Sequence, residues 1–175
     1  QSNEKKLKKR LILATMTYYQ THWDQVKSSS DFEILKAFYE EVLKNNPSKF
    51  SSPHITRGYI DFHGESEIKE NEALINAHLK AVDQKPAIGL QFELIRKSPS
   101  LEKVYFPMMI KSLESQNNSE IEGMFAYIMN HGFIDNATPE SKQLLKSHID
   151  KIQSNDSLKS SELNTYFKKE SKEDM

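Results

Sequence analysis

The sequence predicts an all-α fold, and three observations support this prediction. Apolar residues recur at steps of three and four along most of the chain, which is the spacing of one helix face. Residues that favour helix starts and ends flank these stretches. No segment shows the alternation of apolar and polar residues that a half-buried strand requires. We therefore expect a single domain of about eight or nine helices over residues 1–153, followed by a polar C-terminal tail over residues 154–175.

The first two helices are predicted over residues 3–27 and over residues from about 31 to 45. In the first, one stripe of residues at helical spacing is expected to face the core: Leu7, Leu11, Ala14, Tyr18, His22 and Val26. Ser30 or Asp31 is a suitable N-cap for the second helix, because its side-chain oxygen can accept a backbone N–H. This helix should end before Pro47, which disfavours helical geometry in the preceding residue.

Residues 52–64 are predicted to form a third helix, although Gly58 in its middle costs about 1 kcal/mol relative to Ala. Ser52 can cap this helix, Pro53 suits its first position, and Gly64 suits the position just past its end. Three residues then share one apolar face: Ile55, Tyr59 and Phe62.

Further helices are predicted over residues 66–83, 86–98 and 100–113, the last one capped by Ser100 and kinked at Pro107. Another should begin at the capping box of Ser119 and Glu122 and end at Gly132, which suits a left-handed C-terminal cap. Thr138 and Pro139 mark the start of a helix that reaches residue 152. In the tail, three residues are compatible with one short docking helix: Leu163, Tyr166 and Phe167.

The connections between the predicted helices are short, which favours antiparallel neighbours. Either an antiparallel bundle or a short superhelical, solenoid-like array of helix pairs fits this pattern. The helical segments share no fixed residues in register, so no named repeat family is indicated.

Charge is dense and nearly balanced, with 24 Lys and Arg against 25 Asp and Glu, and the net charge of −1 makes nucleic acid an unexpected partner. One basic cluster lies at the N-terminus: Lys5, Lys6, Lys8, Lys9 and Arg10. We interpret it as the solvated start of a helix, with contact to a membrane surface or an acidic partner as the alternative. No stretch approaches the ~18 consecutive apolar residues of a transmembrane segment.

The sequence begins at Gln1 rather than Met, and we expect that an upstream segment was removed. A secretion leader or a lipoprotein anchor is compatible with this, as is a peripheral membrane tether through the removed segment. With the absence of Cys, it favours an exported, periplasmic or lipoprotein-like location, while the compartment stays open.

The densest group of ionisable and aromatic side chains lies in the third predicted helix: His54, Arg57, Tyr59, Asp61 and His63. Arg57 and Asp61 stand four residues apart and can pair on one side of the helix. We weigh an intrahelical salt bridge against a binding surface, because Arg is the side chain best suited to carboxylate or phosphate. Trp23, which flanks the first stripe, is a further candidate as a contact anchor.

The common catalytic and metal-binding signatures are absent from the sequence. No His has Glu three residues before it, and neither the His-Glu-x-x-His motif nor the Gly-rich phosphate-binding and serine-hydrolase motifs occur. The absence of Cys removes thiolate chemistry. We therefore predict no catalytic residue, no metal site and no cofactor.

The preferred hypothesis is a non-enzymatic helical binding protein, such as an adaptor, an inhibitor or an immunity-like module, with a protein partner. An exposed apolar patch rimmed by charge would favour it. The alternative is an enzyme or small-ligand-binding protein whose inter-helix pocket uses residues of the 54–63 segment. It requires some of those side chains to converge with an ionisable group from elsewhere in the chain.

Overall fold

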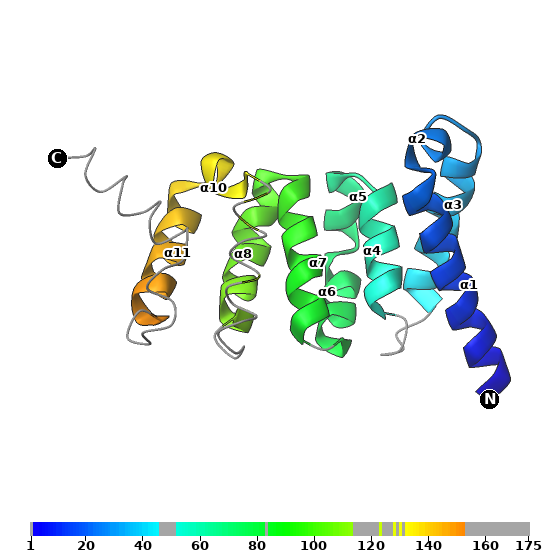
Figure 1. The fold of residues 1–175 in the computed structure, drawn as a ribbon, viewed down its shortest axis with the longest axis horizontal. Coiled ribbons are helices and arrows are strands. Elements are labelled where there is room, and N and C mark those ends of the chain that lie inside the picture. Colours follow the sequence, from blue (N-terminus) through cyan, green and yellow to red (C-terminus); the bar gives the residue numbers. More distant parts are fainter. Residues whose placement is uncertain are drawn as a thin grey trace. The chain divides into compact units, whose positions relative to one another are not determined.

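The computed structural model describes residues 2–45, 52–82, 84–113, 123, 128, 130 and 132–152. Every regular element in these residues is a helix, and none of them belongs to a strand (Figure 1). The all-α prediction is therefore confirmed for the described part of the chain. The chain divides into two compact units, Gln1–Glu93 and Leu94–Met175. The prediction of a single domain over residues 1–153 stays a prediction, as does the choice between a bundle and a superhelical array.

The first unit is built around one central helix, α4 (Ser52–Phe62), which packs against α1, α3 and α6. Its helices are α1 (Ser2–Thr21), α2 (Trp23–Val26), α3 (Asp31–Asn45), α4, α5 (Glu65–Glu70), α6 (Glu72–Ala81) and the first part of α7 (Gln84–Lys97). Figure 1 shows that α1, α3, α4 and α6 alternate in direction, as short connections predict. The helical interpretation of residues 52–64 is confirmed for Ser52–Phe62. The predicted role of Gly64 is wrong, because the helix ends two residues earlier and Gly64, with φ −81° and ψ 176°, precedes α5.

Two predicted helices are each interrupted by one residue. The predicted helix over residues 3–27 breaks at His22, whose backbone angles of φ −117° and ψ 29° are not helical. The predicted helix over residues 66–83 breaks at Asn71, with φ −106° and ψ 16°. The Asn71 side chain donates to the Glu67 carbonyl at 3.1 Å and to the Tyr59 hydroxyl at 2.9 Å. Such side-chain bonds give the backbone an alternative to the continued helix.

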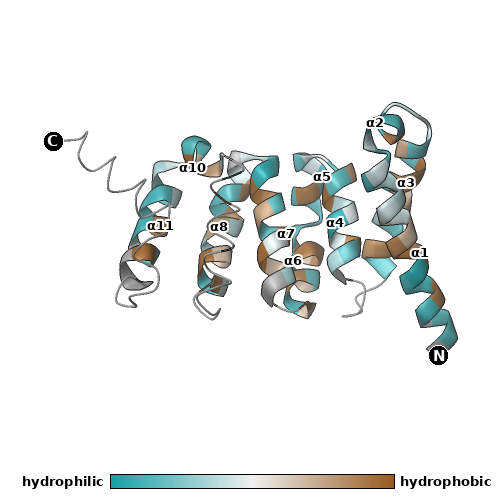
Figure 2. Cartoon of the chain, viewed as in Figure 1, coloured by the Kyte–Doolittle hydropathy of each residue, from teal (hydrophilic) through white to brown (hydrophobic). Residues whose placement is uncertain are grey.

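The face of α1 that contacts the core is not the predicted one. Ile12 and Tyr19 are buried, whereas Leu7, Leu11 and Tyr18 of the predicted stripe are 70%, 55% and 45% exposed. The stripe prediction was therefore wrong for most of its length, because α1 carries a second apolar face that packs inward. In Figure 2 the first turns of α1 are hydrophilic and its middle is hydrophobic.

Gly58 lies in the interior of α4 because the Tyr39 ring of α3 packs directly against its backbone. A Cβ atom at residue 58 would overlap three atoms of this ring, closer than real Cβ atoms approach a neighbour. Tyr39 is fully buried. The glycine that weakens the helix locally is thus the residue that allows α3 and α4 to approach each other.

The second unit contains the end of α7, α8 (Pro99–Leu113), α10 (Phe133–Asn136) and α11 (Pro139–Ile152), with α8 packed against α11. The predicted cap at Ser100 is wrong by two residues. Pro99 opens α8, and the Ser100 N–H donates to the hydroxyl of Ser98 at 3.1 Å. The helix continues through Pro107 to Leu113.

One predicted helix boundary in this unit is confirmed, the start of α11. Gly132 adopts the predicted left-handed conformation, with φ 61° and ψ 22°, directly before α10, but most of the helix that it was predicted to end lies outside the described residues. Thr138 caps α11, since its hydroxyl accepts the Ser141 N–H at 3.3 Å. The capping box of Ser119 and Glu122 and the helix predicted in the tail lie outside the described residues.

Candidate functional site

Arg57 lies at the centre of an ionic network that joins three helices of the first unit. Its Nε lies 3.0 Å from both carboxylate oxygens of Asp61, and a terminal guanidinium nitrogen lies 3.0 Å from Glu93 Oε1 of α7. The Tyr19 hydroxyl of α1 donates to Asp61 Oδ2 at 2.7 Å. The side chains of Asp61 and Glu93 are only 15% and 10% exposed. The predicted intrahelical pair therefore exists, and residues from two other helices extend it.

The electrostatics of this network favour its ionic form. Burial raises the pKa of Tyr19, and the charge of Asp61 raises it further, so that the phenol stays a hydrogen-bond donor. Burial lowers the pKa of Arg57, but the carboxylates of Asp61 and Glu93 more than offset this and raise it overall. Both carboxylates contact the same guanidinium, which links α4 to α7, and the Tyr19 hydroxyl links α1 to Asp61.

Tyr59 and His63 lie in the core and hold the turn after α4. Their rings stack with centroids 3.8 Å apart, and His63 Nδ1 lies 2.9 Å from the Tyr59 carbonyl oxygen. The Tyr59 hydroxyl donates to the Glu67 carbonyl at 3.1 Å and accepts from Asn71. Burial raises the pKa of Tyr59 to about 12 and lowers the pKa of His63. Both residues serve the junction between α4, α5 and α6.

The other two candidates lie outside the ion pairs of this network, although the Trp23 ring contacts the ring of Tyr19. His54 is half-buried at the start of α4, where burial, and then the charge of Lys9, lower its pKa. Trp23 is half-buried and belongs to an aromatic cluster, with ring centroids 5.5 Å from Phe62 and 6.1 Å from Tyr19. The structure thus brings Arg57 and Asp61 together and places the remaining predicted residues elsewhere.

Sequence reasoning missed the most conspicuous surface feature of the first unit, which we call the α1 stripe: Leu7, Leu11, Ala14 and Tyr18, all exposed. The Tyr18 hydroxyl donates to Asp31 Oδ2 of α3 at 3.2 Å. Ile34, one turn further along α3, is 65% exposed. The helical spacing of these residues was visible in the sequence, but the spacing does not reveal that they face outward.

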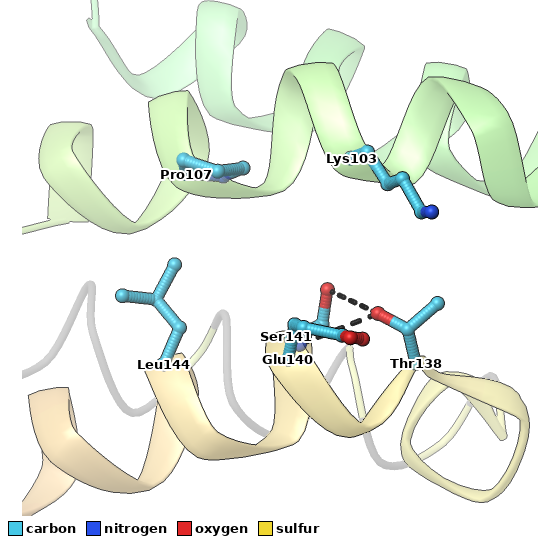
Figure 3. A pocket seen from close by; sticks show the side chains of 6 residues that line it. All are labelled: Lys103, Pro107, Thr138, Glu140, Ser141 and Leu144. Atoms are coloured by element: carbon cyan, nitrogen blue, oxygen red, sulfur yellow. Dashed lines mark hydrogen bonds between the residues drawn. The ribbon is translucent and has the colours of Figure 1, made fainter.

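The second unit holds a cavity of about 250 Å³ between α8 and α11 (Figure 3). Lys103 and Pro107 line it from α8, and Leu144 projects toward them from α11. The hydroxyl of Thr138 at its edge donates to Glu102 at 2.7 Å and pairs with Ser141 at 3.1 Å. None of the predicted site residues lines this cavity, so it gives no support to a pocket at the 54–63 segment.

Among the described residues, no group of three or more His, Cys, Asp or Glu side chains could hold a metal ion. No helix in this part of the chain is long and apolar enough to cross a membrane. Comparisons of the chain with protein-family models, with curated proteins and with solved structures gave no match.

Proposed function

We propose that this chain is a non-enzymatic interaction module that binds a protein partner through the α1 stripe. The supporting observation is the exposure of large apolar side chains on one face of a regular helix. Leu7, Leu11 and Tyr18 are 70%, 55% and 45% exposed, and Ile34 of α3 is 65% exposed. Apolar residues that gather on one face mark interaction sites more often than scattered ones do.

The distribution of apolar residues around α1 supports a role beyond folding. Ile12 and Tyr19 already attach this helix to the core, with 1% exposure each. The opposite face does not need apolar residues for the fold, and charged residues there would be the ordinary choice for a solvated helix. Burial of one Leu side chain stabilises a contact by about 1.5–3 kcal/mol, which would be available to a partner.

A site-specific photocrosslinking experiment in the source cells tests this proposal. The change Leu11→p-benzoylphenylalanine places the reactive group in the stripe, and Gln20→p-benzoylphenylalanine places it at an exposed position on another side of α1. We expect a covalent adduct with one identified protein from position 11 and none from position 20. Adding Leu7→Glu should abolish the adduct while the thermal melt of the chain stays unchanged.

Two results contradict the proposal. One is the absence of any adduct at position 11, and the other is an equal set of adducts at both positions. Because Leu7 is exposed, its substitution disturbs no core contact, and loss of the adduct in the Leu7→Glu variant reports on binding.

A small-ligand or catalytic site at the 54–63 segment is the alternative function, and one observation favours it. Arg57 and Asp61 do converge with Glu93 and Tyr19 from other helices. These groups contact one another, however, and none of them lines the cavity between α8 and α11. Binding of a ligand here should be sensitive to Arg57→Lys, which keeps the charge but removes the bidentate geometry.

A further inference from the structure

The α1 stripe has the spacing of a coiled-coil seam. Its four residues follow one another at steps of four, three and four, which matches alternating d and a positions of a heptad. Residues at such positions form a narrow line along one side of a helix and fit between the side chains of a second helix. The exposed face of α1 is therefore shaped for a helical partner.

The flanks of this seam are positively charged. When Leu7 occupies a d position and Leu11 an a position, Lys8 and Arg10 fall at the neighbouring e and g positions. Both side chains are exposed, and neither forms an ion pair with another residue in the part of the chain that the structure describes. Lys6 is also exposed and lies one turn before Arg10, on the same side. Charges at e and g positions select the partner of a coiled-coil helix.

We infer that the partner of the α1 stripe is an amphipathic helix whose apolar seam is flanked by Asp or Glu, so that its carboxylates pair with Lys8 and Arg10. This inference rests on the proposed function and specifies the chemistry of the partner. Binding of this kind places the apolar anchors of one helix into the seam of the other, and the charges set specificity and association rate.

Charge disfavours two other partners for the α1 stripe, a second copy of the chain and an anionic membrane surface. In a symmetric pairing of two copies, Lys8 and Arg10 would meet the same basic residues of the second copy, and like charges across a coiled-coil seam repel. An anionic membrane surface would attract the basic residues, but Glu4 and Asp31 lie at the two ends of the stripe and oppose it. A separate helix avoids both kinds of repulsion when it carries acidic residues opposite Lys8 and Arg10 and none opposite Glu4 and Asp31.

Synthetic stapled helices of defined sequence test this inference with the full chain. One peptide carries Leu at the heptad core positions and Glu at the flanking positions, and the second differs only in having Lys at those flanking positions. Fluorescence anisotropy should show that the chain binds the Glu peptide at least roughly tenfold more tightly than the Lys peptide, and that added salt reduces this difference. The Leu11→Asp variant should lose binding to both.

A charge-reversal variant gives the sharper result. Lys8→Glu with Arg10→Glu should invert the preference, so that the Lys peptide binds more tightly than the Glu peptide. The matched control reverses two exposed lysines on other helices, Lys80→Glu and Lys111→Glu, and should leave the preference unchanged. Since all four positions are exposed, thermal melts of both variants should resemble that of the unaltered chain.

Several outcomes overturn the inference. Equal affinity for the two peptides, or no binding to either, contradicts it. Leu11-dependent sedimentation with phosphatidylserine vesicles, without peptide binding, shows a membrane surface to be the occupant. A Leu11-dependent doubling of mass in sedimentation equilibrium shows it to be a second copy. If a photocrosslinked protein is found at position 11 but no charge preference appears, the proposed function stands and this inference fails. If no adduct forms, both fail.

Discussion

At Gly58 of α4 the ring of Tyr39 occupies the space in which a side chain would lie. Gly58→Ala should therefore destabilise the chain by about 1–3 kcal/mol, because overpacking outweighs the gain of up to about 1 kcal/mol in helix propensity. Urea unfolding followed by circular dichroism measures this difference in the free energy of unfolding.

Gly89 provides the matched control for this prediction. It also lies inside a helix, α7, but apart from the adjacent residues and the backbone of that helix nothing lies within 4 Å of the position that its Cβ would take. Gly89→Ala should stabilise the chain by about 0.5–1 kcal/mol. If both substitutions stabilise the chain, the ring of Tyr39 does not confine residue 58.

Two adjacent tyrosines offer a second comparison at the residue scale. The Tyr19 hydroxyl donates to Asp61 at 2.7 Å in a partly buried setting, and the Tyr18 hydroxyl donates to Asp31 at 3.2 Å on the surface. Tyr19→Phe should reduce the free energy of unfolding by about 1.5–3 kcal/mol, since hydrogen bonds to charged groups contribute that much when desolvated. Tyr18→Phe should leave it nearly unchanged, because this hydrogen bond lies on the surface. Equal effects in chemical denaturation would contradict the assigned role of the network.

Part of this network could be predicted from the sequence. The pairing of Arg57 with Asp61 follows from their separation by one helical turn. Tyr19 lies 42 residues from Asp61, and Glu93 lies on a different helix. Their participation depends on how α1 and α7 pack against α4, and no local pattern records such packing.

At the scale of elements, Thr138 connects two helices of the second unit. Its hydroxyl accepts the Ser141 N–H as the cap of α11, and its N–H and hydroxyl both donate to Glu102 of α8, at 2.9 and 2.7 Å. Thr138→Ala should destabilise the chain by about 1–2 kcal/mol through loss of the cap. Thr17→Ala removes a hydroxyl that only bonds an exposed carbonyl of its own helix, at 2.9 Å, and should be nearly neutral in thermal unfolding.

Helix α1 shows why periodicity predicts an element more reliably than its orientation. The stripe through Leu7 and Leu11 and the face through Ile12 and Tyr19 both have helical spacing. The sequence of α1 alone does not show which of the two faces is buried. The face with Tyr19 is buried because its ring packs against aromatic rings of α3 and α4. The ring centroid of Tyr19 lies 5.7 Å from that of Tyr39 and 4.9 Å from that of Phe62.

At the scale of the whole molecule, buried histidines should make stability depend on pH. His78 is fully buried, and its Nε2 lies 3.1 Å from the Leu43 carbonyl oxygen. Burial lowers the pKa of His78 and that of His63. The unfolded chain therefore binds protons below about pH 6.5 that the folded chain does not. The contribution of the neutral, buried histidines to the stability of the folded chain is complete above that pH. It is lost as the pH falls through the lower pKa that each histidine has in the folded state.

Urea unfolding should thus show that the free energy of unfolding decreases when the pH is lowered from about 7.5 to about 5.5. The decrease should be at most about 1.4 kcal/mol per pH unit for each histidine. His78→Gln should reduce this slope. A slope that is unchanged in the variant, or stability that increases on acidification, would contradict the assignment.

The fold class could be predicted from the sequence because helix starts and periodicity are local properties. Thr138 with Pro139, and Ser52 with Pro53, mark helices that the structure contains. The breaks at His22 and Asn71 were not predicted, because the apolar periodicity continues across them. In the case of Asn71 the break depends on contacts with Tyr59, which is twelve residues away.

The contact between Gly58 and Tyr39 also constrains how this sequence can diverge. Because one position holds the ring and the other must leave room for it, the two are expected to covary among any homologues of this chain. A lineage that replaces Tyr39 with a smaller residue becomes free to acquire a side chain at position 58. A lineage that keeps the ring must keep the glycine, whatever happens to the surface residues around it.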